Sequence, residues 1–113
     1  MLNIDSKTNK ITIINGDTGF IHLVVDNYKL VLGDVVRFTV KSNIYDNEEV
    51  IAKDYTDFLE DGSCIIEFES QDTRDLDAGT YYYDVQVSLS DGRVDTIIGP
   101  CKLVINKGVT ERY

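Results

Sequence analysis

Hydrophobic and polar residues alternate with a period of two along most of this chain. The clearest run covers residues 81–89, where Tyr, Tyr, Val, Val and Leu occupy every second position. Because successive side chains of a strand point to opposite faces, this alternation predicts strands with one buried face. Similar runs occur over residues 11–13, 20–25, 36–41, 64–68, 94–98 and 101–105. The pattern is weaker at 49–53 and 55–59, where we expect two short strands, and at 71–76, where we expect one helical turn.

Turn residues separate these runs. Asn15-Gly16-Asp17 and Asp61-Gly62 each precede a run, and Asp91-Gly92 predicts a tight hairpin because this pair tolerates positive φ angles. Pro100 has no N–H group and is expected to interrupt the last ladder. The spacing favours an all-β protein, an antiparallel β-sandwich of seven or eight strands with at most one short helical turn. We expect one domain over residues 1–113, with residues 107–113 as a loose tail.

Composition supports this interpretation. The chain has 113 residues, 42% of them hydrophobic, which is enough for the core of one domain. Cys64 and Cys101 are too few for a disulfide framework, and with a single His they fit no zinc pattern. We therefore expect two free, reduced and buried thiols and no metal or other cofactor.

The formal net charge of −9 affects the choice of partners. Nucleic acids and anionic membranes both attract basic surfaces, so neither is an expected partner. The first residues carry no positively charged segment, and no apolar run is long enough for a signal peptide or a membrane helix. We expect a protein without a signal peptide that is made and kept in the cytoplasm, or leaves it by a route other than secretion.

No pattern indicates catalysis. The sequence contains no Gly-x-Ser-x-Gly motif and no Gly-rich phosphate loop, so no catalytic residue is assigned and an enzyme is not expected. Two acidic clusters remain open to two interpretations: oxygen ligands for Ca²⁺, or solvated loops with a helix cap. They comprise Asp54, Asp57, Glu60 and Asp61 in one cluster, and Asp72, Asp75 and Asp77 in the other.

Several apolar side chains fall on the outward phase of their strands. Phe20 and Val24 flank His22, opposite in phase to the expected core positions of the same strand. On a soluble subunit, such side chains mark a contact surface unless loops cover them. The candidate interface consists of Phe20, His22, Val24, Ile97 and Val104. Of the three consecutive tyrosines at 81–83, alternation places only Tyr82 outside.

The segment before the clearest strand carries a recognisable motif. Asp77, Gly79 and Tyr81 resemble the Asp-x-Gly-x-Tyr tyrosine corner of immunoglobulin-like domains, in which the Tyr hydroxyl bonds back to nearby backbone. Tyr83 stands where antibody domains have a Cys, and the chain has no Trp. The resemblance thus implies an immunoglobulin-like sandwich without the inter-sheet disulfide.

A second resemblance covers roughly residues 11–110. The residues that carry it are Gly16-Asp17-Thr18, 30–41, Asp72-Thr73, Leu76, 79–87 and 91–100. In these turn and core positions the chain is similar to small proteins of Firmicutes phages and prophages, and to the N-terminal domain of phage baseplate upper proteins. The resemblance implies a non-enzymatic virion component of head surface, tail or baseplate, whose partners are other virion proteins and copies of itself. The alternative is an adhesive immunoglobulin-like module that binds a glycan or a host surface protein.

Overall fold

The computed structural model describes residues 2–110, so the last three residues of the expected tail lie outside the described residues. The described part is almost entirely β-structure, as the alternation predicts. Its strands are β1 (Asn3–Ile4), β2 (Ile11–Ile14), β3 (Gly19–Leu23), β4 (Val35–Lys41), β5 (Ile51–Tyr55), β6 (Cys64–Phe68), β7 (Gly79–Ser88) and β8 (Val94–Asn106). The helix of this part is the single turn α1 (Ser70–Thr73).

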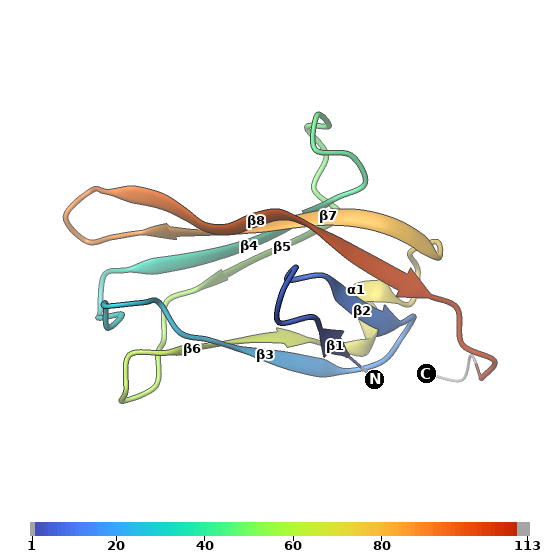
Figure 1. Cartoon of the computed structure of the whole chain (residues 1–113), viewed down its shortest axis with the longest axis horizontal. Helices are drawn as coiled ribbons and strands as arrows, with labels where there is room; N and C mark the ends of the chain where they lie inside the picture. The colour runs from blue at the N-terminus through green and yellow to red at the C-terminus, as the bar shows by residue number, and fades with distance from the viewer. Residues whose placement is uncertain (1, 111–113) are drawn as a thin grey trace.

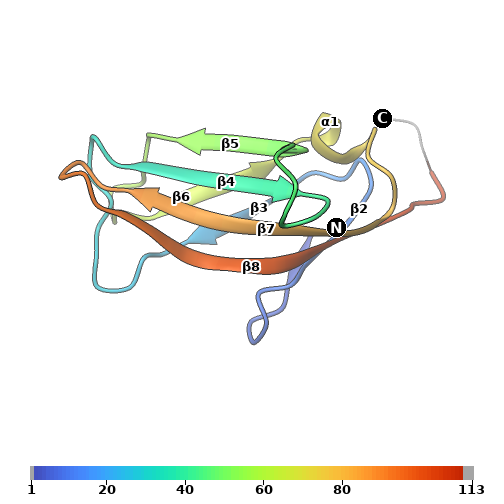
Figure 2. The ribbon, with the colours of Figure 1, turned by 90° about the horizontal axis from the view of Figure 1, so that it is seen from above.

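The strands form two sheets that face each other. Six strands make the larger sheet in the order β1-β2-β8-β7-β4-β5, and β3 pairs with β6 in the smaller one. Figure 1 shows β4, β5, β7 and β8 as the upper layer and β3 and β6 as the lower layer. Seen from above in Figure 2, β5, β4, β7 and β8 lie side by side in the order of the ladder.

The larger sheet is mixed, and the expectation of a wholly antiparallel sandwich is wrong in this respect. Strand β2 runs parallel to the end of β8, with Ile11 opposite Leu103 and Ile13 opposite Ile105. All four side chains are buried, so this pairing places the apolar phase of both strands in the core. Alternation defines the buried face of a strand but carries no information about the direction of its neighbour.

The core lies between the two sheets. The Phe38 ring on β4 meets the Phe68 ring on β6 edge-on, with the ring centroids 5.5 Å apart. On the neighbouring strand, the Tyr83 ring lies 5.6 Å from Phe38. These aromatic side chains join the two layers. They are surrounded by the buried aliphatic side chains Ile11, Ile13, Leu23, Leu30, Val36, Val40, Ile51, Ile66, Val85, Val87, Leu103 and Ile105.

Several elements differ from their expected bounds, and the short strand β1 was not expected. The edge strand expected at 49–53 is β5, two residues later, and no strand forms at 56–59. The helical turn begins at Ser70 and ends at Thr73. Strand β8 continues through Gly99 and Pro100 as one element with register irregularities against β7.

Gly99 explains why β8 is not interrupted. Its φ angle is +112°, and a Cβ atom there would lie 2.8 Å from the Asp84 Cα and 2.8 Å from the Tyr83 carbonyl oxygen. A residue without a side chain therefore lets β8 pass close to β7 in a conformation that other residues rarely adopt. Because the pairing with β7 is already irregular here, the ladder does not need an N–H group from Pro100, and β8 continues past it.

Candidate functional site

Three of the five residues of the candidate interface lie together on the smaller sheet. Phe20 and Val24 are 65% and 64% exposed, and His22 lies between them on the outward phase of β3. In the register of the two strands, Ile65 of β6 stands opposite His22. We call this surface the β3 face, made of Phe20, His22, Val24 and Ile65. Sequence reasoning missed Ile65, although its position between Cys64 and Ile66 assigns it the outward phase.

The other two residues do not join this surface. Val104 alternates with the buried Leu103 and Ile105 and so lies on the outer side of the larger sheet, away from the β3 face. Ile97 is half-buried, packs against the core and lines a hollow with Val25 and other residues. The expectation of one patch containing all five residues is therefore wrong. Alternation assigns a face within a strand, but it cannot assign the strand to a sheet.

His22 is held by a short chain of hydrogen bonds. Its Nε2 atom lies 2.7 Å from the Ser63 hydroxyl, which in turn lies 2.5 Å from an Asp61 carboxylate oxygen. Because the Ser63 proton goes to Asp61, the imidazole must donate its own proton to Ser63. In a catalytic triad the carboxylate holds the histidine and the histidine accepts from the serine. The order here is different, so the arrangement fixes the turn beside β3 and does not activate a nucleophile.

The Asp61 carboxylate is the negatively charged member of this series of hydrogen bonds. Hydrogen bonds from the Ser63 hydroxyl and the Ser63 backbone N–H lower the pKa of Asp61, because they stabilise its ionised form. The Asp61 carboxylate therefore stabilises the turn that contains it.

The tyrosine corner has the expected hydrogen bond. The Tyr81 hydroxyl donates to the Asp77 carbonyl oxygen over 2.7 Å, and the Tyr81 ring is buried. Gly79, between them, has a φ angle of +154° and space around its Cα. The Asp77 side chain takes no part in this bond, because the backbone of Asp77 supplies the acceptor.

Asp72, from the second acidic cluster, caps α1. Its carboxylate accepts from the Glu69 backbone N–H over 2.7 Å, and the Glu69 side chain accepts reciprocally from the Asp72 backbone N–H. The same carboxylate forms a partly buried ion pair of 2.6 Å with Lys53 of β5. Among residues 2–110, no group of three or more His, Cys, Asp or Glu side chains gathers as a metal site would need.

The two cysteines are free thiols on different sheets. Cys64 of β6 is buried and Cys101 of β8 is half-buried. Burial raises the pKa of Cys64 to about 11, because the thiolate is poorly solvated there. This favours the unreactive thiol form at neutral pH.

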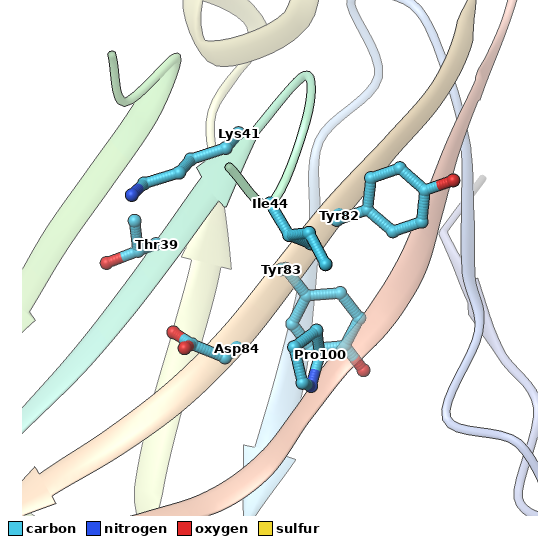
Figure 3. Close-up of a pocket in the computed structure, with 7 residues that line it drawn as sticks. All are labelled: Thr39, Lys41, Ile44, Tyr82, Tyr83, Asp84 and Pro100. Carbon is cyan, nitrogen blue, oxygen red and sulfur yellow. The ribbon is translucent and has the colours of Figure 1, made fainter. Parts of the chain in front are cut away.

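A second surface lies on the outer side of the larger sheet, where the connection of residues 42–50 rises above β4 and β7 (Figure 1). A hollow of about 90 Å³ forms between this connection and the sheet, and Figure 3 shows the residues that line it. We call it the Tyr82 hollow, lined by Thr39, Lys41, Ile44, Tyr82, Tyr83, Asp84 and Pro100. A wider depression of about 650 Å³ continues from it past Tyr45 and Thr80.

The connection supplies a part of this surface that sequence reasoning missed. Of the three consecutive tyrosines at 81–83, only Tyr82 was expected outside. Ile44 and the 87% exposed Tyr45, which were not expected there, stand beside it. The adjacent apolar pair Ile44-Tyr45 within the polar stretch Ser42–Glu49 is the signal that could have indicated them. The surface therefore combines aromatic, apolar and charged groups from three separate segments.

The charged groups of the hollow are not paired. Within residues 2–110, the Asp84 carboxylate and the Lys41 ammonium make no ion pair with each other and no hydrogen bond to another group. Partial burial raises the pKa of Asp84; Lys41 opposes this effect and Glu49 adds to it. The hollow thus holds a partly desolvated carboxylate beside an ammonium group that does not reach it.

Comparison with models of known protein families and with curated proteins gives no match for this chain. No helix in residues 2–110 has the length and apolar character needed to cross a membrane.

Proposed function

We propose that this chain is a non-enzymatic structural protein of a bacteriophage or prophage virion, with an immunoglobulin-like sandwich as its fold. It acts by protein–protein assembly on the head surface, the tail or the baseplate. The observation that carries the proposal is the β3 face, where the apolar side chains of Phe20 and Val24 are 65% and 64% exposed. Its partners are other virion proteins and copies of the chain itself.

The edges of the smaller sheet support an assembly role. Within residues 2–110, β3 pairs with one strand, β6. The other edge of β3 therefore has no strand partner. The free edge of β6 is different. The Glu67 N–H donates to the Tyr55 hydroxyl over 3.1 Å, and the Glu67 carbonyl accepts from Lys53 over 2.8 Å. Side chains of β5 thus cover the free edge of β6, while the other edge of β3 has no strand partner within residues 2–110 and can pair with one from another protein.

The resemblance to phage proteins supports the same conclusion from the sequence. The tyrosine corner and the two facing sheets are features that such sandwich domains share. The His22–Ser63–Asp61 chain has the wrong order for catalysis, which favours a non-enzymatic role.

The substitution Phe20→Asp tests this proposal. It places a charge on the β3 face without touching the core, so the free protein should keep its fold while incorporation into particles is lost. Circular dichroism checks the fold. Mass spectrometry of purified particles of the phage that encodes the chain measures how many copies are incorporated. The matched control is Leu32→Asp, the same change at another exposed position away from the β3 face, which should incorporate normally.

Normal incorporation of Phe20→Asp would reject the β3 face as the contact. If the unmodified chain is missing from purified particles altogether, the structural role itself is wrong.

The second candidate function is that of an adhesive module which binds a glycan or a host surface protein. The Tyr82 hollow favours it, because a depression with aromatic, apolar and unpaired polar groups is typical of ligand sites. The two functions use different faces, so one protein can have both.

A further inference from the structure

We infer that the Tyr82 hollow binds an uncharged sugar residue of a glycan. The inference goes beyond assembly through the β3 face and gives the second candidate function a location and a ligand class. It rests on the geometry of the outer side of the larger sheet, and not on the resemblance to phage proteins.

The polar wall of the hollow indicates the hydrogen-bonding character of the ligand. In Figure 3 the Thr39 hydroxyl, the Lys41 ammonium and the Asp84 carboxylate lie on the same side of the hollow. Thr39 and Asp84 stand opposite each other in the register of β4 and β7. An ammonium only donates and a carboxylate only accepts, so a ligand that satisfies both must carry donors and acceptors side by side. Neighbouring hydroxyl groups on a sugar ring have this property.

The apolar wall indicates the shape of the ligand. Figure 3 places Ile44, Tyr82 and Pro100 on the side of the hollow away from the Lys41 ammonium. Aromatic and apolar side chains cover the C–H surface of a ligand, while a few polar groups orient it. A sugar ring presents a C–H face and a rim of hydroxyl groups, and so matches both walls. The wider depression past Tyr45 can receive the next residue of a chain.

The opposite charges of the hollow disfavour ionic ligands. A cation attracted by Asp84 would be repelled by Lys41, and an anion attracted by Lys41 would be repelled by Asp84. The half-buried Asp84 carboxylate is already poorly solvated, and no group within residues 2–110 donates to it. A hydroxyl donor restores the lost hydrogen bond without adding charge, which is why we favour an uncharged sugar over an ionic one.

A nuclear magnetic resonance titration of the ¹⁵N-labelled chain tests the inference. Glucose, galactose and N-acetylglucosamine serve as uncharged probes, and glucosamine and glucuronate serve as charged analogues. At least one uncharged sugar should shift the backbone amides of residues 39–45 and 82–84 with a millimolar dissociation constant. Glucosamine and glucuronate should bind more weakly than glucose.

Substitutions locate the site. Asp84→Asn and Tyr82→Ala should each weaken binding about tenfold, the loss that corresponds to one charge-assisted hydrogen bond or one aromatic contact. Tyr82→Phe keeps the ring and should bind normally. The matched control is Gln86→Ala, the next outward position of β7 after Asp84 and outside the hollow. The amide spectrum of each variant reports whether it is folded.

Three results would overturn the inference: no shift at these amides with any uncharged sugar, equal or tighter binding of the charged analogues, or unchanged binding by both Asp84→Asn and Tyr82→Ala. Incorporation of Tyr82→Ala into particles should stay normal in every case. Failure of sugar binding and failure of assembly are therefore separate outcomes.

Discussion

Tyr81 is the residue whose role is most directly visible in both sequence and structure. Its hydroxyl bond to the Asp77 carbonyl holds the segment before β7, and its ring is buried in the core. We expect Tyr81→Phe to lower the free energy of unfolding by about 1 kcal/mol, the usual net value of such a bond. Tyr81→Ala should lower it by about 3 kcal/mol or more, because a buried ring is lost. Urea denaturation followed by circular dichroism measures both; no loss in either variant would contradict the corner role.

Single residues could be predicted where a local pattern defines their role. The outward phase of Phe20 and Val24 is confirmed by their exposure, because a strand repeats every two residues. Long-range partners gave no such signal. Lys53 of β5 reaches Asp72 of α1, and His22 of β3 reaches Ser63 in the turn before β6. No spacing rule connects residues that are brought together only by the complete fold.

At the scale of elements, most strands could be predicted, but only the β7–β8 pair of neighbours could. Strand β7 matches the clearest alternating run, and the Asp91-Gly92 turn joins it to β8 as expected. The parallel β2 contact and the continuity of β8 through Pro100 depend on tertiary packing and on Gly99. The connection of residues 42–50 contributes the part of the Tyr82 hollow that alternation cannot place, because loops have no period.

Asp34 links two elements that are far apart in the sequence. This fully buried carboxylate accepts hydrogen bonds from the Tyr28 hydroxyl at 2.8 Å and from the backbone N–H groups of Val31 at 2.9 Å and Ser90 at 2.8 Å. It joins the connection between β3 and β4 to the hairpin between β7 and β8. Burial would raise the pKa of Asp34, but these hydrogen bonds outweigh burial and lower it.

This shift gives a pH-dependent stability. A carboxyl group whose pKa is lower in the folded state stabilises the fold above its unfolded pKa of about 3.9. That contribution is lost as the pH falls through the lower folded value. Asp34→Asn should lower the free energy of unfolding by about 1–3 kcal/mol at neutral pH, because a buried donor loses its acceptor. Its stability should also fall less steeply in acid than that of the unmodified chain.

Urea denaturation at a series of pH values measures both effects. Asp95→Asn, at an exposed position of β8, is the control and should match the unmodified chain at neutral pH. A variant Asp34→Asn with unchanged stability would show that the two loops are held together in another way.

At the scale of the whole molecule, charge and exposed apolar side chains act in opposite directions. The chain is elongated, about 45 × 31 × 25 Å, and carries a net charge of −9. Like charges keep free subunits apart, while the β3 face favours contact. The salt concentration determines which of the two effects is stronger. Charge repulsion reaches over about 30 Å at 0.01 M salt, but only over about 8 Å at physiological ionic strength.

We therefore expect a free chain that is monomeric at low salt and associates weakly as salt rises. Sedimentation velocity at increasing sodium chloride concentration measures this, and Phe20→Asp should remove the salt-induced association while Leu32→Asp should keep it. Screening strengthens contacts that apolar burial drives and charge opposes, so association that grows with salt indicates an apolar contact. Its loss in Phe20→Asp but not in Leu32→Asp places that contact on the β3 face. A stable dimer at low salt that persists in Phe20→Asp would place the contact elsewhere, with an open strand edge such as that of β5 as the next surface to test.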